Sequence, residues 1–92
     1  MNVVDNPATS RYELWVDDHV VGFAAYSRRD PGVLVLPHVE IETAYKGRGL
    51  GSALVQGTLD QVRAAGDRVV PVCPFVVAYL KRHPEYTDLV TS

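Results

Sequence analysis

The chain has 92 residues, of which 47% are hydrophobic and 22% are charged, and its formal net charge is −2. This length and composition predict a single globular domain with a modest core. The slight negative charge argues against nucleic acid or an anionic membrane as the main partner. No apolar run is long enough to span a membrane. One cysteine excludes an internal disulfide, argues against a closed zinc site and fits a cytoplasmic protein.

The N-terminal part of the chain has the pattern of extended strands. Residues 1–9 are predicted to be a loose polar lead. Alternating apolar side chains predict one strand over residues 11–16 and a second strand over residues 20–28. The polar run Asp17-Asp18-His19 between them predicts the tight turn of a β-hairpin.

A third extended segment covers residues 33–41 and follows a turn at Pro31-Gly32, where proline presets φ and glycine permits a positive value. Within this segment, Pro37 has no backbone N–H to donate, so one uninterrupted central strand is not expected. We expect a break, a bulge or a kink at Pro37, or two strands in tight sequence.

The pattern becomes helical in the second half of the chain. The apolar positions of residues 49–65 fall on one broad face, which predicts an amphipathic helix that Gly66 ends. Residues 68–73 are predicted to form a short buried strand, and a second helix is expected from Pro74 to Arg82. A helix between two strands implies a parallel crossover. We therefore predict an α/β (α+β) fold, with a mixed, mostly antiparallel sheet, a βαβ-like unit and two helices.

Three glycines separate the extended segment from the first helix, in the run Gly47-Arg48-Gly49-Leu50-Gly51. Glycine lets the backbone approach a ligand closely, and the start of a helix offers unpaired N–H groups with a partial positive charge. This junction therefore predicts a site for phosphate or pyrophosphate. The spacing fits neither a dinucleotide fingerprint nor a P-loop. Tight packing without a ligand is the alternative use of such glycines.

The segment 45–54 resembles the acetyl-CoA signature of the GNAT superfamily of N-acetyltransferases, Arg/Gln-x-x-Gly-x-Gly/Ala. Lys46 stands at its first position, which keeps a cation near the pyrophosphate without the bidentate fork of arginine, and Arg48 could supply that contact. The predicted element order over residues 11–86 also resembles the GNAT core, without its two usual N-terminal helices. The run Cys73-Pro74-Phe75 is similar to a signature of the very small single-domain members.

This resemblance implies a single acetyl-CoA-binding domain over residues 1–92, with acetyl-CoA or another short acyl-CoA as the cofactor. The backbone near Ile41 would contact the pantetheine arm, and Pro74 and Phe75 would complete the cofactor site. The acyl thioester would lie where the strand ending at Cys73 diverges from the strand ending at Ile41. The residues implied to hold the pyrophosphate are Lys46, Gly47, Arg48, Gly49, Leu50, Gly51 and Ser52.

Two residues of the C-terminal part are candidates for catalysis. Tyr79 resembles the helix tyrosine that protonates the departing CoA thiolate in GNAT enzymes, and its alternative is a core aromatic on an apolar helix face. Cys73 directly precedes a helix, and helix N-termini favour the thiolate, which could accept the acyl group as a covalent intermediate. Its alternatives are a small buried apolar residue or a wall of the pocket during direct transfer.

On the strand before the loop, His38 and Glu40 alternate with Val39 and Ile41, so the two titratable side chains share one face. Glu40 could remove a proton from an attacking amine, directly or through water, and His38 could do the same. The alternative for both is a solvated pair on the exposed face of a sheet.

These observations favour transfer of an acetyl or short acyl group to a primary amine, with a backbone N–H at the strand divergence polarising the thioester carbonyl. The acceptor would be a protein lysine, a polyamine or another small molecule. The alternative is a CoA-binding sensor or partner module with weak or no turnover. A domain that has lost its ligand is disfavoured, because the three glycines would then cost helix stability without benefit.

Overall fold

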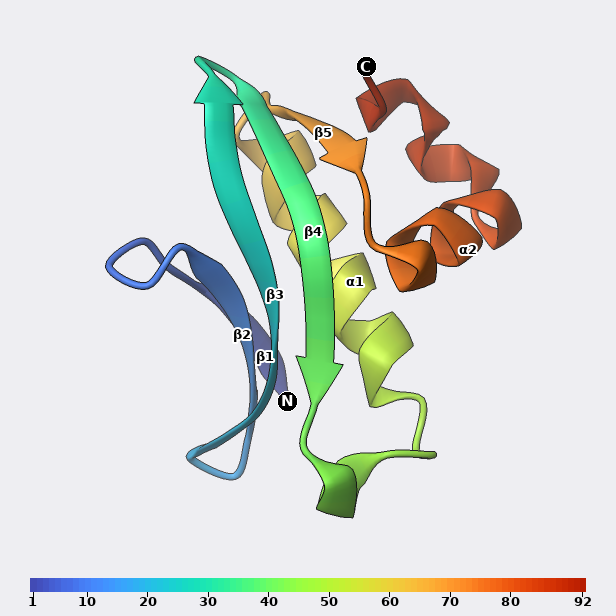
Figure 1. The fold of residues 1–92 in the computed structure, drawn as a ribbon. Helices are drawn as coiled ribbons and strands as arrows, with labels where there is room; N and C mark the ends of the chain where they lie inside the picture. Colours follow the sequence, from blue (N-terminus) through green and yellow to red (C-terminus); the bar gives the residue numbers. More distant parts are fainter.

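A five-stranded sheet in the order β1-β2-β3-β4-β5 forms the centre of the computed structural model, which describes residues 1–92 (Figure 1). Neighbouring strands are antiparallel except β4 and β5, which are parallel. The predicted mixed sheet with a βαβ-like unit is therefore confirmed. The elements in chain order are β1 (Asn2–Asn6), β2 (Arg11–Val16), β3 (His19–Asp30), β4 (Val33–Ile41), η1 (Thr43–Tyr45), α1 (Leu50–Ala64), β5 (Arg68–Pro71), α2 (Pro74–Arg82) and η2 (Pro84–Leu89).

The hairpin between β2 and β3 turns on two aspartates in the left-handed region, Asp17 at φ 49° and Asp18 at φ 62°. Positive φ at both central residues is what a type I′ hairpin turn requires, and aspartate tolerates it better than most residues. The next turn uses Gly32 at φ 80° and begins β4. Both turns follow the sequence prediction because their backbone conformations depend on local residues alone.

The N-terminal segment is not the loose lead predicted from its polar sequence. Residues 2–6 form β1, which pairs antiparallel with β2 at the edge of the sheet. Val3 packs against α1 at Gly57, where an added Cβ would collide with the valine side chain. The Gln61 side chain donates to the backbone oxygen of Val3. These contacts with α1 are distant in sequence, so the local pattern did not reveal the strand.

The predicted irregularity at Pro37 is a bulge within one strand. Tyr26 of β3 faces two residues of β4, Leu36 and Pro37, because Ala25 pairs with His38 and Ser27 pairs with Val35. An extra residue reverses the alternation of side chains along the strand. As a result the buried Leu36 and Val39, three residues further along the strand, face the same side of the sheet, toward α1.

The core lies between the sheet and the apolar face of α1 (Figure 1). As the periodicity predicted, that helix buries Leu54, Val55, Thr58, Leu59 and Val62. The second helix packs beside β4 and β5, and the turn of η2, which was not predicted, follows it. Tyr86 of η2 donates to Asp60 of α1 at 2.6 Å, which fastens the C-terminal segment to the first helix. None of the helices has the length and apolar character needed to cross a membrane.

Candidate functional site

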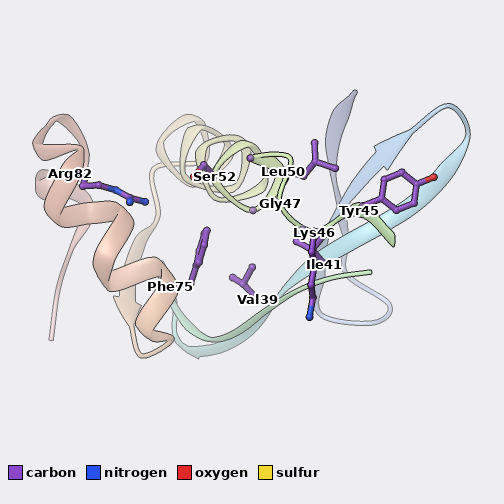
Figure 2. A pocket seen from close by; sticks show the side chains of 11 residues that line it. Val39, Ile41, Tyr45, Lys46, Gly47, Leu50, Ser52, Phe75 and Arg82 are labelled. Carbon is purple, nitrogen blue, oxygen red and sulfur yellow. The ribbon is translucent and has the colours of Figure 1, made fainter. Parts of the chain in front are cut away.

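A cavity of about 470 Å³ opens between the end of β4, the start of α1 and one face of α2 (Figure 2). It combines an apolar wall with the glycine loop and two cationic side chains. No carboxylate lines it. The lining residues are Val39, Ile41, Tyr45, Lys46, Gly47, Gly49, Leu50, Gly51, Ser52, Phe75 and Arg82.

The glycine loop presents free backbone donors to this cavity. Gly47 and Gly49 have φ values of 80° and 74°, and open space surrounds the position of a Cβ at each, so backbone conformation rather than packing requires glycine there. The first backbone hydrogen bond of α1 runs from Ala53 to Gly49. The successive N–H groups from Gly47 to Ser52 donate to no backbone carbonyl. This run of donors at a helix N-terminus suits an oxyanion or phosphate.

The third glycine of the loop serves close packing instead. A Cβ on Gly51 would stand 2.8 Å from the ring of Phe75, which would have to move. Gly51 therefore lets the start of α1 approach α2 through this ring. In Figure 2 Phe75 of α2 and Val39 of β4 lie below the start of α1, where they form the apolar wall of the cavity.

The strands β4 and β5 separate at the edge of the cavity. Their pairing ends at Leu36 and Pro71, and the N–H groups of Val72 and Cys73 both donate to the oxygen of Leu36. Beyond this point no strand pairs with β4 on that side, since β3 occupies its other edge. The second half of β4 therefore keeps a free edge beside the cavity. The strands diverge as the GNAT resemblance implied, but β5 ends at Pro71 and not at Cys73 as predicted.

The matching family model is described as GCN5-related N-acetyl-transferase, and it covers residues 11–89 of this chain. The chain belongs to this family. A mycothiol acetyltransferase from Corynebacterium glutamicum is 36% identical over an alignment of 74 positions, which covers 74% of this chain and 25% of that protein. The chain thus spans about a quarter of the length of the curated relatives it matches.

Solved structures of N-acetyltransferases share the fold. A GCN5-like protein from Staphylococcus aureus superimposes with a TM-score of 0.72 at 14% identity, over 99% of this chain and 88% of the other. A GNAT family acetyltransferase from Elizabethkingia anophelis, solved with acetyl-CoA bound, gives a TM-score of 0.61 at 13% identity, over 86% of this chain and 54% of the other. The predicted resemblance to GNAT enzymes is therefore confirmed at the level of family and fold.

Most of the residues that the GNAT resemblance implied for cofactor binding gather in the cavity. They are Ile41, Lys46, Gly47, Gly49, Leu50, Gly51, Ser52 and Phe75. Arg48 and Pro74 are not among the lining residues; the Arg48 guanidinium lies 5.4 Å from the centre of the Tyr45 ring. Sequence reasoning missed Val39, Tyr45 and Arg82. The signal for Arg82 was its spacing of seven residues from Phe75, which places both on one face of α2.

The carboxylate proposed as a base lies on the opposite side of β4 from this cavity. Glu40 is exposed and contacts Nε2 of His38 at 3.2 Å, so the two side chains share a face as predicted. Glu40 also lines a second cavity of about 240 Å³, together with Arg11, Val20, Gly22, Phe23 and Glu42. The bulge at Pro37 sets this arrangement, because it turns Val39 and Ile41 toward α1 and Glu40 away from it.

The predicted nucleophile, Cys73, is 6% exposed and belongs to the core. It is the N-cap residue of α2, and no side-chain hydrogen bond caps that helix. Its side chain is not among those that line the cavity. Pro74 follows at the first helical position and contributes no N–H, so this N-terminus presents fewer free donors than that of α1.

The predicted general acid, Tyr79, is 3% exposed and, like Cys73, is not among the residues that line the cavity. Its ring stacks on His83 with the centroids 4.1 Å apart and contacts Tyr86 in a tilted arrangement. Burial is the main cause that raises the pKa of Tyr79 above 10, and the charges of Glu85 and Asp60 raise it further. The hydroxyl therefore stays protonated at neutral pH.

Proposed function

We propose that this chain binds acetyl-CoA in the cavity at the start of α1 and transfers its acetyl group to a primary amine. The observation that carries the proposal is the run of unpaired N–H groups from Gly47 to Ser52, which opens onto a cavity without carboxylates. Such donors and the side chain of Lys46 suit a diphosphate. Membership of the N-acetyltransferase family and the acetyl-CoA bound to the similar Elizabethkingia structure support the same ligand.

The pantetheine arm would run from the glycine loop along the free edge of β4. Val39, Ile41 and Phe75 offer it apolar contacts, while unpaired backbone groups of the strand offer hydrogen bonds to its amides. The acetyl thioester would then lie at the separation of β4 and β5. A backbone N–H at this separation would polarise its carbonyl oxygen.

The amine would approach from the other face of the sheet, where Glu40 lines the second cavity. Access to the thioester would be open at the β5 side of β4, because β5 does not pair with β4 beyond Leu36. Glu40 would take a proton from the amine as its nitrogen attacks the carbonyl carbon. A protein lysine, a polyamine or another small amine all satisfy this chemistry.

Collapse of the tetrahedral intermediate breaks the C–S bond and leaves the CoA thiolate. Tyr79 is the candidate that would protonate this sulfur, and its raised pKa keeps the hydroxyl protonated at neutral pH. Because Tyr79 is buried and outside the cavity lining, this role requires the bound thiolate to reach its hydroxyl beneath the lining residues. The acetyl group would pass directly to the amine, because Cys73 is 6% exposed and lies outside the cavity lining. An acetyl-Cys73 intermediate is the competing route.

The first test is calorimetric titration of the protein with acetyl-CoA, followed by an acetylation assay with spermidine and with a lysine peptide. We expect saturable binding and turnover of at least one amine. The variant Glu40→Gln should keep the affinity for acetyl-CoA and lower kcat by about 100-fold or more, in the range for removal of a general base. His38→Gln on the same face is the matched control and should keep most of the rate.

Absence of acetyl-CoA binding at millimolar concentration would contradict the proposed cofactor. Binding without turnover of any amine would favour the alternative, a CoA-binding sensor or partner module. The Cys73 route is tested by intact-mass measurement after incubation with acetyl-CoA. Direct transfer predicts no acetyl adduct and an unchanged rate in Cys73→Ala, whereas an adduct of wild type that this variant lacks would establish the covalent route.

A further inference from the structure

The second helix brings a cation to the cavity that the loop motif does not account for. Arg82 lies in the last turn of α2 and lines the cavity with Phe75, while the buried Tyr79 lies between them on the same helix face. The next residue back, Lys81, faces a different groove formed with β5 and η2. The helix therefore directs one of its two terminal cations into the cavity.

Arg82 is free to bind a ligand, because it enters no ion pair and no side-chain hydrogen bond. Four other arginines pair with carboxylates, and Arg68 donates to the backbone oxygen of Asp88; the four are Arg11, Arg28, Arg29 and Arg63. No carboxylate lines the cavity that Arg82 enters. An unpaired guanidinium beside such a cavity suits a phosphate, to which it can donate two parallel hydrogen bonds.

The two cations of the cavity stand on opposite sides of it. In Figure 2 Arg82 extends from α2 on one side and Lys46 lies on the other, with Phe75 and Val39 between them. Lys46 directly precedes the glycine loop and its free N–H groups. A ligand that satisfies both sides carries two anionic groups joined by a spacer. Coenzyme A has this form, with a diphosphate and a separate phosphate on the 3′ position of its ribose.

We propose that Arg82 binds the ribose 3′-phosphate of coenzyme A and makes the cavity discriminate CoA from dephospho-CoA. This inference rests on the proposed function, since it assigns a second part of the same ligand. The glycine loop holds the diphosphate, which both compounds share, and the guanidinium holds the group that only CoA has. Arg82 thereby becomes a specificity-determining residue supplied by a different element from the loop.

The test is calorimetric titration with CoA and with dephospho-CoA of wild type, Arg82→Gln, Arg82→Lys and Lys81→Gln. A charge-assisted contact at an exposed position predicts that wild type prefers CoA by about tenfold. Arg82→Gln should bind both compounds with the affinity that wild type shows for dephospho-CoA. Arg82→Lys should recover part of the preference, and Lys81→Gln should retain all of it.

Three results would overturn the inference. Equal affinity of wild type for the two compounds would show that the 3′-phosphate is not recognised. An equal loss of affinity for both compounds in Arg82→Gln would show that the guanidinium binds the diphosphate. Loss of the preference for CoA in Lys81→Gln as well would show that the preference reflects only the general positive charge of the helix end. In all three the binding of CoA persists and the proposed function stands. If wild type binds neither compound, the proposed cofactor itself fails.

Discussion

The two ends of helix α1 use charge and backbone donors in opposite ways. At its start, Lys46 and the N–H groups of the glycine loop have no partner within the chain. At its end, Arg63 contacts both carboxylate oxygens of Asp88, at 2.7 and 2.9 Å, and donates to the oxygen of Glu85 at 2.8 Å. The charges at the end of the helix hold the C-terminal segment, whereas those at its start remain unpaired.

This difference teaches which polar groups of a small domain are available for binding. Arg28 also pairs with a carboxylate near the end of α1, with Asp67 at 3.6 Å. A charge that is already paired gains little from a ligand, because binding would first have to break the pair. An unpaired cation beside unpaired N–H groups loses only water on binding. The start of α1 is therefore the candidate site, although both ends carry arginine and a left-handed glycine.

The largest expected effect comes from substituting the left-handed glycines at the two ends of α1. Gly49 at φ 74° is the N-cap residue of α1 and Gly66 at φ 75° follows its end, so alanine at either strains a left-handed residue and costs about 1 kcal/mol of stability. Only Gly49→Ala should also weaken CoA binding, by about 100-fold if two charge-assisted N–H contacts are lost. Calorimetry and thermal unfolding of both variants measure the two effects. Equal affinities of the two variants would contradict the role of the loop.

A smaller effect distinguishes the unpaired cation at the start of α1 from the paired cation at its end. Lys46→Met should lower the affinity for CoA by about fivefold, in line with about 1 kcal/mol for an exposed ionic contact, and leave the melting temperature unchanged. Arg63→Met should do the reverse, since it removes the contacts of α1 with Glu85 and Asp88 and does not change the cavity lining. Titration and thermal unfolding of the two variants give this comparison. A loss of CoA affinity in Arg63→Met would show that the ends of the helix are coupled.

The smallest effect is the pH dependence at the paired end of the helix. The guanidinium of Arg63 lowers the pKa of Asp88 below its ordinary value of 3.8. Because the folded pKa lies below the unfolded one, this pair stabilises the fold above pH 3.8 and is lost as the pH falls through the folded value. The melting temperature of Asp88→Asn should therefore fall less steeply than that of wild type as the pH drops below this value.

The control for this pH dependence is Asp18→Asn, in an exposed hairpin turn whose left-handed conformation asparagine tolerates. It should reproduce the acid limb of wild type when melting temperatures are compared across the same pH series. An Asp88→Asn profile that follows wild type as closely as this control does would remove the pair from the acid sensitivity of the fold.

Residues whose conformation depends on near neighbours were predictable from the sequence. The two aspartates of the hairpin turn and the glycines before α1 adopt the positive φ values that their residue types favour. The apolar period of α1 identified its buried face because one helix repeats the pattern over several turns. Local chemistry therefore predicts an anion site at the loop without reference to tertiary contacts.

Residues whose role depends on distant contacts were not predictable in the same way. β1 was not predicted because its sequence is short and polar. Pairing with β2 and packing on Gly57 hold it in place. Alternation along β4 placed Glu40 opposite Val39, but the bulge at Pro37 decided which of them faces the cavity. The burial of Cys73 and the position of the Arg82 side chain at the cavity depend on how α2 packs against the sheet.

The sequence by itself determined the strand–glycine loop–helix unit, the mixed sheet and the family resemblance, because these follow from local conformational preference and from periodicity. Only the tertiary structure decided where β4 and β5 part, which side of β4 carries the carboxylate and which cations remain unpaired. Those properties arise from strand register and helix packing, which bring together residues far apart in the chain. They place the glycine loop and Arg82 on two sides of one cavity.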